Sequence, residues 1–152
     1  MSKVTILFKK LVPEAKAPTR AHDGDAGWDV TAVSVAQERG AYIYGTGLAF
    51  AIQEGYWMDL RARSSIYKTG AVLASGLGTI DAGFRNEVKA VFYTMQSPMF
   101  AMPTYPPYGT GDRIAQLIVQ PALTTDVEFV EVDELPESGD GRGEGGFGST
   151  GR

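Results

Sequence analysis

The chain has 152 residues, of which 43% are hydrophobic and 11% aromatic, a composition typical of one soluble globular domain and unlike that of a disordered chain. Its formal net charge of −4 excludes a generally basic surface, so we expect no stable nucleic-acid binding. The sequence contains no cysteine, which excludes disulfides, thiolate catalysis and Cys-based zinc sites.

The single histidine, His22, lies in a polar loop and is expected to be solvated. Any catalysis must therefore use carboxylates, arginines, hydroxyls and a divalent cation. The apolar run at the N-terminus is too short for a signal peptide, and no other run is long enough to span a membrane. We expect a soluble cytoplasmic protein without membrane contacts.

Short alternating apolar runs follow one another along the chain, with turn signals about every eight to twelve residues and no sustained helical period. This spacing predicts an all-β protein, an antiparallel β-sandwich or barrel, over residues 1–136. The expected strands are 4–8, 30–35, 42–44, 48–52, 56–60, 88–92, 114–119 and a last strand, 127–132, that closes the fold.

Two stretches in the first half carry candidate site residues. Asp29 stands at the head of an expected strand, where its side chain is held more firmly than in a loop. Farther on, Arg63-Ser64-Ser65 precedes Gly70, and either serine is expected to cap a short helical turn. Free N–H groups, hydroxyls and an arginine suit an anion, although a surface helix without a ligand has the same pattern.

The segment Asp81-Ala82-Gly83-Phe84 precedes the strand expected at 88–92. Gly83 can adopt a positive φ, so the segment is expected to form a hairpin turn. Asp81 and Phe84 are then either an ordinary turn carboxylate and a core ring, or half of an active site that handles a proton and stacks a flat ligand.

Residues 94–111 contain four prolines, three methionines and three aromatic residues. So long and apolar a loop is expected to pack on its own domain, on a sister subunit or on another protein, which makes it a candidate partner site. The strand that follows is expected to place Ile114, Gln116 and Ile118 on one face. Gln116 needs partners there, as a satisfied core amide or as a site residue.

Residues 137–152 include seven glycines, and by composition they form a flexible arm. Their match to a dinucleotide-binding glycine pattern is false, because no strand precedes it and no helix can follow. A purely entropic tail has no need of Arg142, Phe147, Ser149 and Thr150. An arginine, a ring and two hydroxyls suit an arm that folds over a nucleoside triphosphate.

Five motifs occur in order between residues 25 and 151: Ala26-Gly27-Trp28-Asp29-Val30, Arg63-Ser64-Ser65, Gly78-Thr79-Ile80-Asp81-Ala82-Gly83-Phe84-Arg85, Gly111-Asp112-Arg113-Ile114-Ala115-Gln116-Leu117 and Arg142-Gly143-Glu144-Gly145-Gly146-Phe147-Gly148-Ser149-Thr150-Gly151. Together they resemble the motifs of the homotrimeric dUTPases. The resemblance implies a jelly-roll β-sandwich and a homotrimer in which the arm of one subunit closes a site formed by the other two.

The same resemblance implies hydrolysis of dUTP to dUMP and pyrophosphate, which limits uracil in DNA and supplies dUMP for dTMP synthesis. Asp81 would deprotonate the water that attacks the α-phosphorus, and Asp29 would anchor the water shell of Mg²⁺. Asp112 and Arg113 would pair to support the site. The substrate-binding residues would be Arg63, Ser64, Ser65 and Gln116 for the phosphates, main-chain groups near Gly78 and Ile80 for uracil, Phe84 for the deoxyribose, and Arg142, Phe147, Gly148, Ser149 and Thr150 from the arm.

The chain departs from the family pattern at Phe84, Asn86, Ser65 and Ser75, where relatives usually carry Tyr, Gly, Gly and Asn. Asn tolerates positive φ, so the turn is expected to survive. Two alternatives stay open. One is dCTP deaminase, which shares the fold and an Arg-Ser-Ser element but is disfavoured by the complete arm. The other is a binding or regulatory module that uses the 94–111 loop.

Overall fold

The computed structural model describes residues 3–95, 106–123 and 127–136, and within them the chain is almost entirely β-structure, as predicted. None of the helices in this part of the chain is long and apolar enough to cross a bilayer. The elements are β1 (Ile6–Lys10), β2 (Trp28–Thr31), β3 (Ser34–Glu38), β4 (Ala41–Gly45), β5 (Leu48–Ile52), β6 (Tyr56–Ala62), the 3₁₀-helix η1 (Ser64–Lys68), β7 (Ala71–Leu73), β8 (Gly78–Ile80), β9 (Lys89–Thr94) and β10 (Arg113–Pro121).

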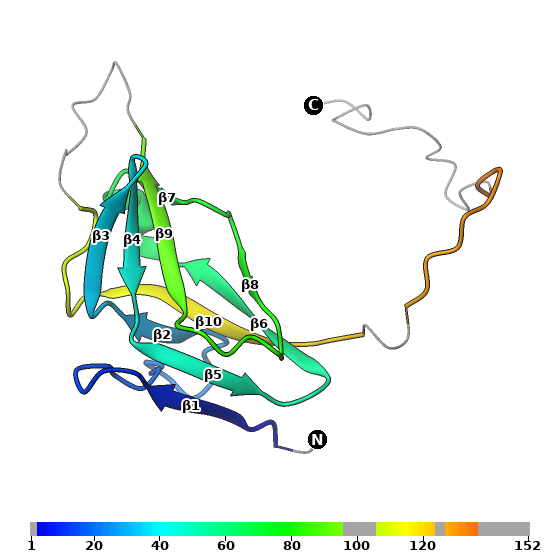
Figure 1. Cartoon of the computed structure of the whole chain (residues 1–152), viewed down its shortest axis with the longest axis horizontal. Helices are drawn as coiled ribbons and strands as arrows, with labels where there is room; N and C mark the ends of the chain where they lie inside the picture. The colour runs from blue at the N-terminus through cyan, green and yellow to red at the C-terminus, as the bar shows by residue number, and fades with distance from the viewer. Residues whose placement is uncertain (1–2, 96–105, 124–126, 137–152) are drawn as a thin grey trace.

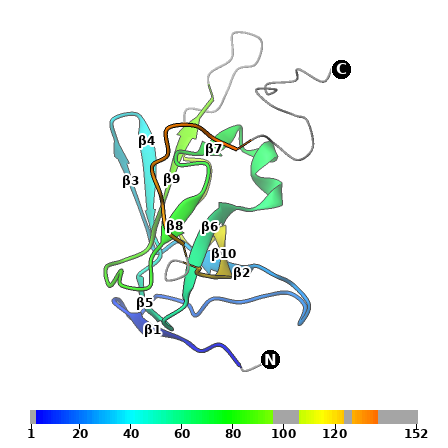
Figure 2. The ribbon, with the colours of Figure 1, turned by 90° about the vertical axis from the view of Figure 1, so that its right-hand side faces the viewer.

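The strands form two four-stranded antiparallel sheets and a smaller pair, β1-β5. One large sheet has the order β2-β10-β6-β8, and the other has the order β3-β4-β9-β7. Figures 1 and 2 show the two sheets on either side of the interior, with β1 and β5 across one end. The predicted antiparallel sandwich is therefore confirmed.

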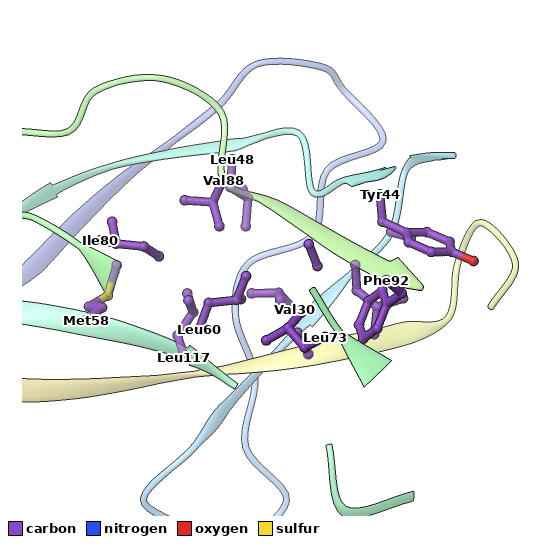
Figure 3. Packing of buried hydrophobic residues seen from close by; sticks show 14 of the residues in the cluster. Val30, Tyr44, Leu48, Met58, Leu60, Leu73, Ile80, Val88, Phe92 and Leu117 are labelled. Carbon is purple, nitrogen blue, oxygen red and sulfur yellow. The ribbon is translucent and has the colours of Figure 1, made fainter. Parts of the chain in front are cut away.

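The core lies between the two sheets, where apolar side chains from every second strand position meet. Figure 3 shows Met58 and Ile80 near one end of this interior and Tyr44 and Phe92 near the other. The rings of Tyr44 and Phe92 pack edge to face, with centroids 5.8 Å apart. Because both sheets pack on one close-packed core, the strand ends are held in place, and so are the loops that start from them.

The run expected as one strand at 30–35 is in fact split between β2 and β3, which belong to different sheets. Between them, the N–H of Ala32 donates to Asp112 O and the N–H of Val33 donates to Gly45 O. The chain changes sheets at this point while its backbone donors stay paired. Alternation alone could not show this, because the apolar pattern continues across the crossing.

The alternation predicted for β10 is also interrupted. The pairing of β10 with β2 shifts register between Arg113 and Ala115, as at a β-bulge. Ile114 therefore lies in the core together with Ala115 and Leu117, and not on the face of Gln116. The bulge lets the adjacent residues Ile114 and Ala115 both lie in the core.

The predicted closing strand at 127–132 is wrong for the single chain. These residues form no strand, and the side chains of Val127, Phe129, Val130 and Val132 are 55%, 98%, 67% and 52% exposed. An alternating apolar segment forms a strand only where a sheet edge and an apolar surface receive it. Within the described residues, one chain supplies neither.

Removal of the Tyr44 hydroxyl should lower the stability of the fold and should make that stability less dependent on pH in the alkaline range. Burial raises the pKa of Tyr44 above 10.0, against the opposing effect of its hydrogen bond with the Tyr108 backbone. The stabilisation that Tyr44 contributes is therefore fully present below the pKa of this phenol in the unfolded chain, and it is lost as pH rises through the pKa of the phenol in the folded protein. Tyr44→Phe should lower the free energy of unfolding by about 1–3 kcal/mol at neutral pH, because Tyr108 N and O lose their partner.

Urea unfolding of both proteins at neutral pH and above about pH 10 measures the two effects. Tyr44→Phe should also lose stability less steeply above that pH than the wild type does. A variant with unchanged alkaline dependence would contradict the assignment of that dependence to Tyr44.

Candidate active site

One carboxylate binds two guanidinium groups at the end of the β2-β10-β6 sheet. Asp29 Oδ1 accepts from Arg63 Nε at 3.0 Å, and Asp29 Oδ2 accepts from Arg113 Nη1 at 2.9 Å. The three residues come from neighbouring strands or their ends, and the Asp29 side chain is only 16% exposed. The cluster carries one more positive than negative charge, so it favours an anion such as a phosphate.

The predicted pairing of Asp112 with Arg113 is wrong. Asp112 Oδ2 accepts from the N–H of Gly109 at 2.7 Å, while Arg113 binds Asp29. The side chains of adjacent residues at the start of a strand point to opposite sides of the sheet, so those of Asp112 and Arg113 do not pair with each other. Asp112 instead closes the turn that leads into β10, and its carbonyl accepts from Ala32 N.

The helical turn predicted after Arg63 is present as η1, but it has no serine cap. Arg63 occupies the N-cap position, and no side chain bonds there. Neither Ser64 nor Ser65 hydroxyl bonds to another described residue, so both remain available to a ligand. The turn ends with Thr69 at the C-cap and Gly70 at a φ of 63°, as the glycine in the sequence suggested.

Gln116 lies half-buried beside this cluster, and its position depends on Gly27. Its Nε2 donates to Ala62 O at 3.4 Å. A Cβ atom built on Gly27 would lie 2.1 Å from Gln116 Oε1, so only glycine fits there without moving the amide. Gln116 is also the register partner of Asp29. The amide is thus held at the edge of the charged cluster.

Tyr108 adds a side chain near this cluster that no motif indicated. Its ring packs against Tyr44 and Phe92, with centroid separations of 6.0 and 5.5 Å. Burial raises the pKa of the Tyr108 phenol, the Arg63 guanidinium opposes this effect, and Asp112 adds to it. In the sequence, Tyr108 belonged to the proline-rich loop, and nothing in that loop placed it beside Arg63.

A second group of predicted residues lies around the turn between β8 and β9. Gly78, Ile80 and Phe84 line a cavity of about 160 Å³, together with Leu60, Thr79, Glu87, Val88 and Lys89. Phe84 is 42% exposed, and Asp81 is exposed with no side-chain bond to another described residue. An exposed carboxylate beside a ring-lined cavity can receive a water and a flat ligand.

The turn itself differs from the expected one. The N–H of Phe84 donates to Asp81 O at 3.0 Å, which closes a four-residue β-turn. Gly83 is not among the described glycines with positive φ, so the turn does not use that freedom. Asn86 needs none either, and its Oδ1 accepts from Glu87 N at 2.7 Å.

One chain does not bring these two groups together. Ile80 is the register partner of Met58, and Asp81 follows directly beyond it. Arg63 lies five residues farther along the path of β6, about 17 Å away at the rise of an extended strand. In Figure 1 the turn after β8 lies near the start of β6, opposite the arrowhead that leads to Arg63. The two groups therefore lie toward opposite ends of β6.

The remaining candidate residues lie outside the described part of the chain. These are Arg142, Phe147, Gly148, Ser149 and Thr150 of the arm, and residues 96–105 of the proline-rich loop. The roles predicted for them stay predictions.

No group of three or more His, Cys, Asp or Glu residues that could hold a metal occurs among the described residues. Asp29 is the carboxylate of the cluster that favours an anion, and both of its oxygens already accept hydrogen bonds from arginines. Such a carboxylate suits a cation that keeps its own waters and touches the protein through few groups, as Mg²⁺ does.

The chain is similar in sequence to known proteins of one family. A sequence profile of the dUTPase family matches residues 13–151. A deoxyuridine 5'-triphosphate nucleotidohydrolase of Wolinella succinogenes is 35% identical over 155 residues, covering 100% of this chain and 97% of that protein. The protein of the same name from Thermobifida fusca is 40% identical over 152 residues, covering 97% of this chain and 79% of its own length.

Solved structures show the same similarity. The dUTPase of Staphylococcus bacteriophage 80alpha with dUPNHPP gives a TM-score of 0.78 at 26% identity, covering 97% of this chain and 99% of that chain. A mutant dUTPase of phage phi11 of S. aureus, whose structure reveals the coordination of a structural Mg(II) ion, gives a TM-score of 0.66 at 25% identity. That likeness covers 86% of this chain and 97% of the phage chain.

Asp29→Asn should destabilise the fold, because two guanidinium groups lose their charged acceptor. The free energy of unfolding should fall by about 1–3 kcal/mol in urea at low salt, with a smaller loss at high salt. Asp23→Asn is the control, since Asp23 is fully exposed and lies 3.7 Å from Arg20, and it should cause no measurable change. Equal effects of the two substitutions would contradict a structural role for the Asp29 ion pairs.

Proposed function

The chain belongs to the dUTPase family and is an enzyme that hydrolyses dUTP, and we propose that Asp81 drives this reaction in sites shared between the subunits of a homotrimer. The products are dUMP and pyrophosphate. In a cell this reaction limits uracil in DNA and supplies dUMP for dTMP synthesis.

The separation of the two half-sites along β6 carries the proposal. An attacking water and the α-phosphorus must approach within about 3.5 Å of each other. The backbone of β6 extends about 17 Å from the residue opposite Ile80 to Arg63, so Asp81 just beyond Ile80 is placed far from a phosphate bound at Arg63 of the same chain. Asp81 of one subunit beside Arg63 of another removes the conflict, and cyclic symmetry then repeats the same site at each interface.

The Asp81 carboxylate acts on the attacking water. It accepts a hydrogen bond from the water and takes its proton as the water oxygen forms a bond to the α-phosphorus. The bond from the α-phosphorus to its bridging oxygen breaks, and pyrophosphate leaves with that oxygen. Asp81 then returns the proton to solvent. Its exposure and lack of a side-chain partner among the described residues support this role.

The phosphate chain lies on the other half-site. Arg63 and the hydroxyls of Ser64 and Ser65 bind its oxygens, and Gln116 orients a phosphate oxygen or a water beside them. The excess positive charge of the Asp29, Arg63 and Arg113 cluster supports this assignment. From the arm, Arg142, Ser149 and Thr150 clamp the γ-phosphate, while Phe147 and Gly148 cover the uracil.

The cavity beside β8 receives the nucleoside. Main-chain groups near Gly78 and Ile80 read the uracil, and Phe84 packs on the deoxyribose where a 2′-hydroxyl would need room. The lining of the cavity by these three residues supports the assignment. Phe84 lacks the hydroxyl of the usual tyrosine, so its part is packing alone.

Mg²⁺ is the proposed cofactor, and the residues present fit it in a water-mediated mode. Asp29 would hold its water shell, since both carboxylate oxygens already accept from arginines and still have lone pairs for water. When bound, Mg²⁺ neutralises the charge of the triphosphate and orients it. The structural Mg(II) ion of the phi11 phage dUTPase supports metal binding in this family.

Two apolar surfaces support the assembly. Residues 127–135 expose Phe129 and Leu135 at 98% and 86% and lead directly into the arm. An apolar groove of about 600 Å³ opens between β1, β5 and the β2-β10-β6 strands, and its lining includes Phe8, Trp28 and Phe50. A single chain leaves both uncovered, as expected for a subunit that gives its C-terminal segment to a neighbour.

Pyrophosphate release from dUTP with Mg²⁺ tests the chemistry. The wild type should turn over rapidly, and Asp81→Ala should lower kcat at least about a thousandfold, because the water loses its base and its position. A chain ending at Ser138 should lose activity as well, since the γ-phosphate clamp is gone. Normal turnover by Asp81→Ala would contradict the mechanism, and ammonia release from dCTP would indicate the deaminase alternative.

Complementation between two inactive variants tests the shared site. Asp81→Ala and Arg63→Ala are each expected to be inactive alone. Co-expressed as mixed trimers, they should recover about a quarter of wild-type activity, because each site draws its Asp81 and its Arg63 from different chains and each draw is intact half of the time.

Two controls accompany the mixture. Light scattering should show trimers for every protein, and mixing either variant with itself should restore nothing. An inactive mixture of exchanged trimers would mean that Asp81 and Arg63 act within one chain, against the separation seen along β6.

A further inference from the structure

The turn that carries Asp81 and Phe84 spans the gap between the two large sheets. It leaves β8 in one sheet and enters β9 in the other. The corner between β4 and β5, residues 45–47, runs beside the second half of this crossing. Three hydrogen bonds join Thr46 and Gly47 of the corner to Glu87 and Val88, and a fourth joins Val88 to Leu48 at the start of β5. The crossing is thus fixed at one place.

Thr46 is the buried part of this connection, with a side chain that is 0% exposed. Its Oγ1 donates to Val88 O at 2.7 Å and accepts from Leu48 N at 3.2 Å. Its own N–H also donates to Val88 O, at 3.3 Å, and Val88 N donates to Leu48 O at 2.9 Å. The buried hydroxyl thus both donates and accepts, and its donated bond goes to the chain leaving the turn.

Glu87 is the second part, one residue before Val88. Its Oε1 accepts from Gly47 N at 2.9 Å, and its Oε2 lies 3.5 Å from Lys89 Nζ. A Cβ atom on Gly45 would lie 2.5 Å from Glu87 Oε1, so the carboxylate sits directly on the corner backbone. Gly47 itself has a φ of 66°, which favours glycine at the donor position.

The other end of the turn follows β8 directly, where Ile80 is the register partner of Met58, and Arg85 adds bonds within the turn. Arg85 Nη1 donates to Ala82 O and to Phe84 O, both within the turn, and reaches Phe50 O at 3.5 Å. Asp81 and Phe84 are themselves exposed. The positions of Asp81 and Phe84 relative to the rest of the fold are therefore set by β8 before the turn and by the anchor at Glu87 and Val88 after it.

We propose that Thr46 and Glu87 are positioning residues for dUTP hydrolysis, which latch the Asp81 turn to the corner between β4 and β5. The inference rests on the proposed role of Asp81. A shift of about 1 Å in a reacting group can lower a rate by about a hundredfold. Contacts that fix the position of the Asp81 turn therefore affect the rate of the chemical step. Thr46 is not among the residues that line the nucleoside cavity, whereas Glu87 is, so Thr46 gives the cleaner test of positioning.

Isosteric substitution at Thr46 separates positioning from folding. Thr46→Val removes both hydroxyl bonds while keeping the shape, and it should lower kcat for dUTP at least about tenfold with a smaller change in KM. Thr46→Ser keeps the hydroxyl and should restore kcat to within about twofold of wild type. Glu87→Ala should lower kcat like Thr46→Val, and Glu87→Gln should retain more activity because its amide oxygen can still accept from Gly47.

Tyr44→Phe is the matched control. Tyr44 is also fully buried on β4, and its hydroxyl likewise makes two hydrogen bonds to backbone groups, but those groups belong to Tyr108. The control should lower Tm as Thr46→Val does, and its kcat and KM should stay at wild-type values. All variants are compared as trimers by light scattering, with Tm measured beside the kinetics.

The outcomes separate the two proposals. An inactive wild type, or an active Asp81→Ala, would overturn the proposed function itself. An active wild type together with a Thr46→Val variant that has lower Tm and normal kcat would overturn the latch alone, and so would Thr46→Ser failing to rescue. If Thr46→Val does not fold, the pair Glu87→Ala and Glu87→Gln gives the same decision, because the Glu87 side chain is 21% exposed and lies at the surface.

Discussion

The hydrogen-bonded register of β6 is the constraint on which the rest of the structure depends. This strand pairs with β10 along seven residues and with β8 along three, so its neighbours cannot slide without turning every side chain to the wrong face. The register sets Arg63 at one end of the strand and the Asp81 turn near the other. Strand pairing alone therefore determines where these candidate site residues lie. Within the described residues, one chain keeps these two ends apart.

The electrostatics of the phosphate half-site follow from the same sheet. Asp29 lies in β2, Arg113 in β10 and Arg63 directly after β6, and the two ion pairs join the ends of these three neighbouring strands. A carboxylate shared by two guanidinium groups fixes both arginines in place and leaves a positive excess. A ligand anion then meets preorganised groups and need not order them itself. Structural support and ligand binding are two results of one arrangement.

Local patterns in the sequence sufficed for much of this. Short alternating runs predicted the sandwich, and the resemblance of five motifs predicted the site residues. Three features escaped because they depend on partners distant in the chain. The apolar pattern continues unchanged where the chain passes from one sheet to the other after Thr31. The pairing of Arg113 with Asp29 joins residues 84 positions apart. The hydrogen bond of Thr46 depends on Val88, which the fold places beside it. The segment 127–132 was predicted as a strand from its composition, which was correct about its apolar character and wrong about what a single chain offers it.

That segment has a consequence for the newly made chain. Until a partner covers it, Val127, Phe129, Val130 and Val132 form an apolar stretch of high β-propensity in water, a composition that promotes uncontrolled strand stacking between molecules. Glu128 and Glu131 interrupt the stretch, and Asp133 and Glu134 follow it. These like charges repel one another when two such segments stack side by side, and so act as gatekeepers against aggregation. The acidic residues therefore oppose stacking of this exposed apolar segment on its copies in other molecules.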